Sequence, residues 1–234
     1  MTLQVALPDK PVQKLDYFSF VRREIAPLLP KNPRRILEVG AGTGGTLRWL
    51  KSQHPQAETT AVELNGALLD QLQKNVDRAI IGSIDETLPT LENYDLILLL
   101  DVLEHLPDAT STLKKLAKLL VAGGQTIVSV PNIAHLSVSA PLLLQRRFAY
   151  QDSGILDRTH LRFFVEATAV EMLNEAGLTV TAGLISGMQG PKARLLDRLS
   201  FGALRHHLAK QYIMRGELSD GKVAQQQVRW TIAR

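Results

Sequence analysis

The first 130 residues alternate short apolar runs with amphipathic segments. Apolar runs bounded by turn residues predict five strands, at 35–39, 59–63, 78–81, 94–100 and 125–130. Apolar positions at helical spacing predict helices between them, one ending near residue 53 and others at 66–75 and 110–121. The run at 94–100 is apolar almost throughout, which is typical of a strand that a parallel sheet buries on both faces. This alternation predicts a doubly wound α/β sheet with right-handed crossovers.

The amino end departs from this alternation. Between residues 15 and 29, apolar positions recur at helical spacing, and Pro30 and Pro33 would stop that helix. We therefore expect residues 1–33 to form an N-terminal helical cap and residues 34–234 to form the main domain.

The pattern also changes after the fifth predicted strand. Residues 131–165 form a connection of a length that usually has a function in a compact domain. We interpret it as a lid loop that contacts the acceptor. A helix is predicted at 166–176. Two strands, at 178–185 and 223–233, are predicted to pair antiparallel, with a helical insertion at 187–222 between them.

Composition narrows the classes of protein. The chain has no cysteine, which excludes disulfides, thiolate metal sites and a cysteine nucleophile. Aromatic residues make up only 5% of the chain, which argues against a surface that stacks nucleic-acid bases. The net charge of +4 permits an anionic partner, although arginine pairs such as Arg22-Arg23 are interpreted as solvated surface. No apolar run resembles a signal peptide or crosses a bilayer, so we expect a cytoplasmic protein.

A glycine-rich turn carries the clearest chemistry. Gly40, Gly42 and Gly44 lie where the first strand meets its helix, and glycine allows a sharp turn and close approach of a ligand to the main chain. Ligands of open α/β sheets bind beyond the carboxyl ends of the strands, which is where this turn falls. With Gly45 the spacing also satisfies the dinucleotide pattern GxGxxG, so the turn alone leaves the cofactor open.

Three acids bear on the choice of cofactor. Glu63 ends the second strand and suits ribose hydroxyls in NAD and in S-adenosylmethionine alike. Glu38, two residues before Gly40, would repel a pyrophosphate but could order an ammonium group. Asp85 follows the third strand, where it could accept a hydrogen bond from an adenine amino group. Together the three acids favour S-adenosylmethionine over NAD.

Residues 35–130 resemble the class I S-adenosylmethionine-dependent methyltransferases. The matching pieces are ILEVGAGTGG at 36–45, AVEL at 61–64, GSIDETLP at 82–89 and YDLILLLDVLEHLPD at 94–108. The resemblance implies a Rossmann-like, doubly wound sheet of seven strands with the last strand antiparallel.

The resemblance also assigns roles by position. It gives Gly40, Gly42 and Gly44 to the methionine end of the donor and Glu63 to its ribose. It implies that Leu64 and Ile84 flank the adenine and that Asp85 accepts from the adenine amino group. It places Asp101 and Val102 in the pocket below the methyl group.

Residues 154–164 are the candidate acceptor site. In this segment Asp157, Arg158 and His160 lie among mainly apolar residues. Burying these polar groups costs free energy unless they pair with each other or with a ligand. With residues 129–132, this segment resembles bacterial methyltransferases associated with glycan and glycolipid assembly. The resemblance implies an oxygen acceptor, such as a sugar hydroxyl.

Methyl transfer to a hydroxyl benefits from a base, and histidine titrates in the useful range. His160 is the first candidate, with Asp157 orienting it or binding acceptor hydroxyls, and His105 is the second. The alternative is that Asp157, Arg158 and His160 form a structural clamp for the lid loop. No group of histidines and carboxylates has metal-ligand spacing along the sequence, so no metal is expected.

The insertion at 187–222 carries seven basic and three acidic residues together with an apolar helical stripe. We interpret it either as a helix packed on the sheet or at a homodimer face, or as a surface that contacts anionic lipid peripherally. Other functions stay open: a small-molecule or quinone-type methyltransferase, an NAD-dependent oxidoreductase, or a non-catalytic partner that binds the donor.

Overall fold

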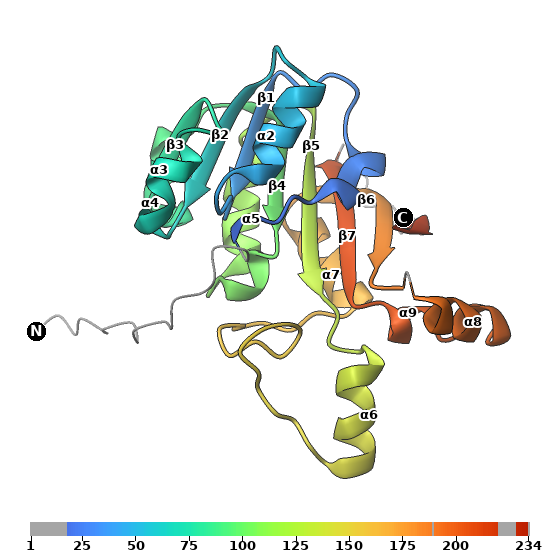
Figure 1. The fold of residues 1–234 in the computed structure, drawn as a ribbon. Coiled ribbons are helices and arrows are strands. Elements are labelled where there is room, and N and C mark those ends of the chain that lie inside the picture. Colours follow the sequence, from blue (N-terminus) through green and yellow to red (C-terminus); the bar gives the residue numbers. More distant parts are fainter. Residues whose placement is uncertain (1–17, 189, 220–227, 234) are drawn as a thin grey trace, which may run out of the picture.

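The computed structural model describes residues 18–188, 190–219 and 228–233, and its centre is one mixed sheet of eight strands (Figure 1). The strand order is β3-β2-β1-β4-β5-β7-β6-β8, with all neighbours parallel except β7, which runs antiparallel to both β5 and β6. The strands are β1 (Arg35–Val39), β2 (Glu58–Glu63), β3 (Arg78–Ile81), β4 (Tyr94–Leu100), β5 (Leu120–Pro131), β6 (Leu178–Ser186), β7 (Gln211–Leu218) and β8 (Trp230–Ile232).

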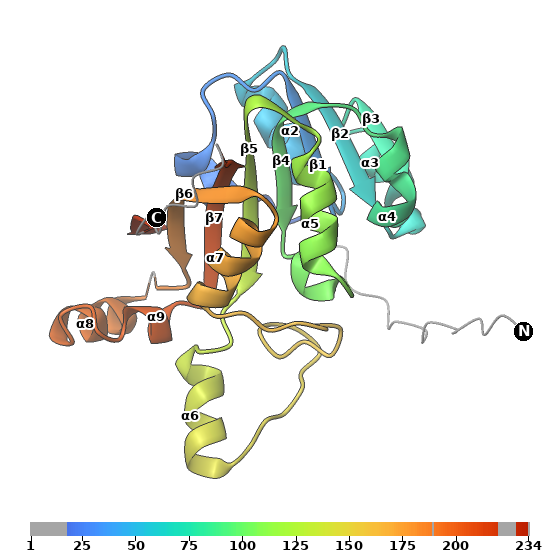
Figure 2. The same ribbon diagram turned by 180° about the vertical axis from the view of Figure 1, so that it is seen from behind.

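Helices cover both faces of the sheet. α2 (Gly45–Gln53) lies on one face, while α5 (Ala109–Ala117) and α7 (Glu166–Glu175) lie on the other (Figures 1 and 2). Two buried apolar clusters follow from this arrangement, because alternate residues of a strand point to opposite faces. In β4, Ile97 and Leu99 join the cluster under α5 and α7, whereas Leu96 and Leu98 join the cluster under α2.

The α/β alternation and the Rossmann-like sheet are confirmed, but the expected seven strands with the last one antiparallel are wrong. The antiparallel strand is β7, which lies inside the expected insertion at 187–222. The helical part of that insertion is limited to α8 (Pro191–Leu199) and α9 (Arg205–Leu208). Polar residues hide the strand character of β7, because Arg215 and Glu217 pair with side chains of neighbouring strands.

The expected antiparallel pairing of 178–185 with 223–233 is also wrong. Of the second segment, the described part is β8, and β8 pairs with β6 in the parallel direction. Residues 223–227 lie outside the described residues.

Among the described residues, the N-terminal helix expected at 15–29 is interrupted. Residues 19–22 follow a non-helical path along the glycine turn, and the 3₁₀ helix η1 (Arg23–Leu28) comes after them. Pro27 inside η1 has no N–H to donate, which limits a regular α-helix here. Residues 1–17 of the expected cap lie outside the described residues.

Shorter helices connect the remaining strands. The expected helix at 66–75 is a 3₁₀ turn, η2 (Gly66–Leu68), followed by α3 (Leu69–Leu72). A capping box between Ser83 and Glu86 starts the short helix α4 (Ile84–Thr87), and the 3₁₀ helix η3 (Leu88–Thr90) follows it. The helix expected at 110–121 ends at Ala117, because residues from 120 onward already belong to β5.

The lid loop expected at 131–165 contains a helix. α6 (Leu136–Gln145) extends beyond the edge of the sheet where β5 ends, and an extended segment then returns to α7 (Figure 1). No described helix has both the length and the apolar character that a membrane crossing needs.

Candidate active site

The glycine turn after β1 is fixed by its backbone conformation. Gly40, Gly42 and Gly44 have φ of +70°, +57° and +78°, a left-handed region that favours glycine. A Cβ on Gly40 would lie 2.7 Å from Val102 Cγ2, and one on Gly42 would lie 2.6 Å from the Phe18 carbonyl oxygen. The turn therefore fits between the end of β4 and the N-terminal segment only without side chains, and it forms a cradle of bare main chain.

Glu63 connects this cradle to the end of β2. Its side chain is buried and accepts hydrogen bonds from the Gly42 and Asn65 backbone N–H groups, both at 2.8 Å. Each carboxylate oxygen keeps a further acceptor position, which is what a pair of ribose hydroxyls requires. The structure therefore places Glu63 beside the cradle, where the resemblance expects the ribose.

The residues expected around adenine follow β2 and β3. Leu64 is 68% exposed and presents an apolar surface that a flat ring could cover. Ile84 is buried, and Asp85 forms a half-exposed ion pair with Lys115 at 3.1 Å. The two strand ends meet through a bond from Gly82 N–H to the Glu63 carbonyl at 3.0 Å.

Glu38 lies at the other end of the cradle, inside the protein. Burial raises the pKa of its carboxyl to about 8, although the positive charge of Arg22 and hydrogen bonding from Thr46 act in the opposite direction. One carboxyl oxygen, Oε2, has no hydrogen-bond partner among the described residues. A buried acceptor without a partner beside a bare-backbone cradle fits the ammonium end of S-adenosylmethionine.

A polar network below the cradle escaped the sequence analysis. Arg22 is 8% exposed and forms an ion pair with Asp101 at 2.5 Å. Its guanidinium also donates to Ser129 Oγ at 3.3 Å and to Gln211 Oε1 at 3.0 Å, while Gln211 donates to Asp101. The interpretation of Arg22-Arg23 as solvated surface is therefore wrong for Arg22, although Arg23 is exposed.

Asp101 and Val102, expected below the methyl group, lie where β4 ends. Asp101 has φ of +59°, a conformation that costs a non-glycine residue free energy and is held by its contacts with Ser129 and Arg22. Val102 contacts the cradle at Gly40. The two residues thus link the donor cradle to the polar network.

The lid loop places its histidine against the segment that follows β4. The backbone N–H groups of Leu161 and Arg162 donate to the Glu104 carbonyl at 2.8 and 3.2 Å. This contact brings the rings of His105 and His160 within 4.8 Å of each other in an edge-to-face arrangement. Two candidates predicted separately as a first and a second base therefore form one pair.

The backbone fixes how each ring of this pair is oriented. Nδ1 of His160 lies 3.0 Å from the Ile155 carbonyl, and Nδ1 of His105 lies 3.2 Å from both the carbonyl and the hydroxyl of Thr159. A donating Nδ1–H leaves Nε2 of each ring as an acceptor.

Asp157 holds the backbone beside this pair but contacts neither ring. Its carboxylate accepts from the Thr159 N–H at 2.7 Å and from the Thr159 hydroxyl at 2.6 Å, and its carbonyl accepts from the His160 N–H. Arg158 turns outward to Asp152. Asp157 therefore holds the turn that presents Thr159 and His160, while Arg158 takes no part.

Glu104 is a second residue that the sequence analysis missed. It is 1% exposed, and neither of its carboxyl oxygens has a hydrogen-bond partner among the described residues. Burial, together with the negative charges of Asp101 and Asp157, raises its pKa well above the usual range. An acid next to His105 in an otherwise apolar turn was the available signal in the sequence.

Comparisons with known proteins identify the family of this chain. A family model described as a methyltransferase domain matches residues 14–182, which is more than half of the chain. A malonyl-[acyl-carrier protein] O-methyltransferase of Anoxybacillus flavithermus is 32% identical over 122 residues, which cover 49% of this chain and 47% of that protein. A ubiquinone biosynthesis O-methyltransferase of Pseudomonas entomophila is 32% identical over 108 residues, covering 42% of this chain and 45% of that protein.

The chain thus spans about half the length of these relatives or less. Among solved structures, a SAM-dependent methyltransferase from Archaeoglobus fulgidus superimposes with a TM-score of 0.64 at 16% identity, over 83% of this chain and 90% of that one. At this identity the superposition supports the fold alone.

Proposed function

Because the chain belongs to the family of S-adenosylmethionine-dependent methyltransferases, we propose that it transfers a methyl group to an oxygen of a large acceptor, a saccharide or glycolipid hydroxyl. The family match decides between the two cofactors that the glycine turn alone leaves open. The observation that carries the acceptor class is the open, outward-facing lid beside the His105–His160 pair.

The donor brings a methyl group on a positively charged sulfur, so the carbon is already activated and the protein mainly aligns the reactants. The chain's own residues hold the donor. The bare cradle at Gly40 and Gly42 would receive its methionine end, the carboxyl group of Glu38 would accept from its ammonium, and Glu63 would accept from its ribose hydroxyls. Leu64 and Ile84 would cover the adenine, and Asp85 would accept from its amino group.

On the acceptor side, a carbon–oxygen bond forms as the carbon–sulfur bond breaks, and the hydroxyl proton must leave. Nε2 of His160 or of His105 can accept that proton, because Nδ1 of each ring is already occupied by a backbone oxygen. Asp157 positions the His105 ring through Thr159, and its carbonyl accepts from the backbone N–H of His160.

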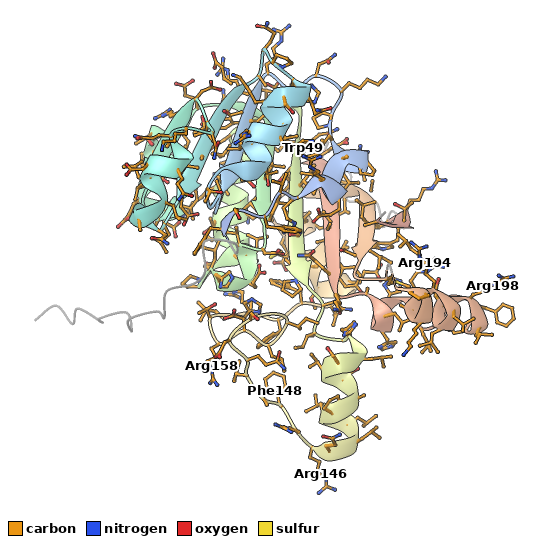
Figure 3. The ribbon with its side chains drawn as sticks, viewed as in Figure 1. Trp49, Arg146, Phe148, Arg158, Arg194 and Arg198 are labelled. Atoms are coloured by element: carbon orange, nitrogen blue, oxygen red, sulfur yellow. The ribbon has the colours of Figure 1, made fainter. Side chains whose placement is uncertain are left out.

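The lid supports a large acceptor because its apolar residues face outward. Leu143 and Leu144 at the end of α6 are 82% and 78% exposed, and Arg146 extends from the tip of this helix (Figure 3). An enclosed apolar pocket, as a small-molecule or quinone-type acceptor would need, is not what these residues build.

α8 presents a second surface with exposed leucines and arginines. Its leucines face outward while its buried polar residue, Asp197, is held by Arg205 at 3.0 Å. Leu199 is 66% exposed, and Arg194 and Arg198 flank the apolar side chains (Figure 3). The leucines of α8 therefore do not pack on the sheet, whereas Ala193 of the same helix contacts the apolar core.

Together, α6 and α8 support a peripheral contact with an anionic membrane, because exposed leucines insert between lipids while arginines attract their headgroups. Such a contact would bring the site to a lipid-linked acceptor. A homodimer through α8 stays a prediction, and it would bury the same leucines.

The relatives favour a second candidate, an acceptor other than a saccharide. One is named for malonyl-[acyl-carrier protein] and the other for ubiquinone biosynthesis. Both names describe oxygen methylation, so the reaction type is common to the two candidates and the acceptor differs.

The test is methyl transfer by the purified full chain from labelled S-adenosylmethionine. The acceptors are a glycolipid extract, malonyl-[acyl-carrier protein] and a hydroxylated quinone-type precursor. We expect label in the glycolipid fraction, recovered as an O-methyl sugar after hydrolysis. Label confined to either of the other acceptors would contradict the saccharide proposal while leaving the methyltransferase intact.

Membrane contact is tested by sedimentation with vesicles of phosphatidylglycerol and of phosphatidylcholine. We expect binding to the anionic vesicles, weakened by Leu143→Glu in α6 and by Leu199→Glu in α8. Leu218→Glu is the control, since Leu218 is 40% exposed but lies on β7. Equal binding to both vesicle types, or none, would contradict the proposal.

A further inference from the structure

Glu104, His105 and His160 form a compact group on the acceptor side. One carboxylate oxygen and one nitrogen of each ring all lie within 4.8 Å of one another. Glu104 is buried, whereas the two histidines are partly exposed. The group therefore has a closed side within the protein and an open side toward solvent.

Both rings have the kind of outer hydrogen bond that metal-binding histidines usually have. In each, Nδ1 lies at hydrogen-bond distance from a backbone carbonyl, that of Ile155 for His160 and that of Thr159 for His105. An imidazole that donates Nδ1–H to a carbonyl keeps a lone pair on Nε2, and this outer contact sets the tautomer and the direction of the ring.

Glu104 supplies an independent observation. A carboxyl group that is 1% exposed, with no hydrogen-bond partner on either oxygen among the described residues, is costly to bury. The carboxylates of Asp101 and Asp157 make its surroundings more negative, and Arg22, whose positive charge also acts on Glu104, already pairs with Asp101 and Glu24. A divalent cation would satisfy the oxygens of Glu104 and offset this negative charge.

We propose that Glu104, His105 and His160 bind a divalent transition-metal ion, of the kind represented by Mn²⁺ or Zn²⁺. Two imidazole nitrogens and one carboxylate oxygen suit these ions, and three protein ligands leave coordination positions open for an acceptor. Ligand atoms about 2.1 Å from one ion lie roughly 3–4 Å apart, so the group closes by about an ångström on binding.

This inference replaces the expectation that no metal is bound. That expectation rested on ligand spacing along the sequence, where His160 is 55 positions beyond His105. The contact of Leu161 and Arg162 with the Glu104 carbonyl brings the two segments together, and the sequence pattern carries no sign of it.

The consequence for the reaction rests on the proposed function. An open position of the ion would take the acceptor hydroxyl and lower its pKa, so that its proton would pass to water. The hydroxyl oxygen would then bond to the methyl carbon as the carbon–sulfur bond breaks. His105 and His160 act in this case as ligands, and no histidine base is required.

The test is direct binding of Mn²⁺ to the tag-free full chain after treatment with a chelator, followed by calorimetry and by loss of the free Mn²⁺ paramagnetic resonance signal. We expect one site per chain. Glu104→Gln and His160→Ala should each weaken binding by roughly a hundredfold, since each removes one of three ligands. His135→Ala is the matched control, because His135 belongs to the same connection but bonds Ser137.

Binding that is absent in the parent chain, or that is unchanged in both variants, would overturn the proposal. Folding of the variants is checked by S-adenosylhomocysteine binding, which should be retained. If methyl transfer persists in the presence of chelators, the metal proposal is wrong and a histidine base remains the explanation. If Mn²⁺ binds stoichiometrically but saccharides are not methylated, the proposed acceptor is wrong and the metal site stands.

Discussion

Arg22 and Asp101 form an ion pair at 2.5 Å although 79 positions separate them in the sequence. The guanidinium is nearly buried and reaches three structural elements, because it also contacts Ser129 on β5 and Gln211 on β7. The floor of the candidate active site is therefore held by a residue from the N-terminal segment.

We expect Arg22→Ala to lower the free energy of unfolding by about 2–4 kcal/mol, because it leaves the Asp101 carboxylate without its cation in a partly buried network. Denaturant unfolding measures this change. Arg23→Ala is the matched control, since Arg23 is exposed, and it should change stability by less than about 0.5 kcal/mol. Equal effects of the two substitutions would show that the network does not stabilise the fold.

Gly42→Ala should weaken S-adenosylhomocysteine binding by at least about tenfold, because a Cβ there meets the Phe18 carbonyl at 2.6 Å in a left-handed conformation. Calorimetry measures the affinity. Gly177→Ala separates the two effects, because Gly177 also has positive φ but nothing lies within 4 Å of its Cβ position. That control should lose about 1 kcal/mol of stability and keep its affinity for the ligand.

Glu38 makes stability depend on pH. Its folded-state pKa is about 8, above the ordinary value of 4.5, so the folded state binds the proton more tightly than the unfolded state does. The stability that this proton contributes is fully present below pH 4.5 and is lost as pH rises to about 8, at up to ~1.4 kcal/mol per pH unit.

The variant Glu38→Gln should abolish this part of the pH dependence and gain stability relative to the parent chain as pH rises from 5 to 8. Thermal unfolding across that range measures the difference. Glu58→Gln, at the exposed start of β2, is the control and should leave the profile unchanged. Parallel profiles for the parent chain and Glu38→Gln would contradict the assignment.

Asp157 should act on the acceptor step and not on donor binding, because it holds Thr159 and touches neither ring. Asp157→Ala should lower kcat/KM for methyl transfer by roughly 10–100-fold with unchanged S-adenosylhomocysteine affinity. Asp157→Asn should recover much of the rate, since its amide oxygen can still accept from Thr159. Asp152→Ala, in the same loop, should be neutral, and an equal loss there would reject the positioning role.

Gly183→Ala should displace β8, because the ring of Trp230 lies against the Gly183 Cα. We expect a loss of about 1–3 kcal/mol and a red shift of tryptophan fluorescence. Gly190→Ala, where nothing lies near the Cβ position, should leave both unchanged. An unchanged spectrum for Gly183→Ala would contradict the packing of Trp230 on β6.

Parts of this molecule that depend on local pattern could be predicted from the sequence. β1 and β4 have the predicted bounds, since mainly apolar segments between turn residues leave little choice of structure. The glycine turn was also predictable, because the left-handed conformation restricts the residue type. β7 was missed because Arg215 and Glu217 make a buried strand resemble a polar, helical segment.

The site residues that escaped prediction depend on contacts between distant segments. Nothing local to Arg22 indicates that Gln211 and Asp101 will surround it. In the same way, Glu104 becomes part of a candidate site only because the lid places His160 next to His105. Tertiary contacts of this kind carry no periodicity that a sequence pattern could detect.

The contact between Arg22 and Gln211 also bears on how this chain folds during synthesis. The two residues are 189 positions apart, so the ribosome must release β7 before the floor of the site can close. A nascent chain can pair β1 to β5 earlier, because those strands are complete by Pro131. We therefore expect the first five strands to pair before the floor of the site forms, so that the chain becomes able to bind its ligand only after β7 has been made.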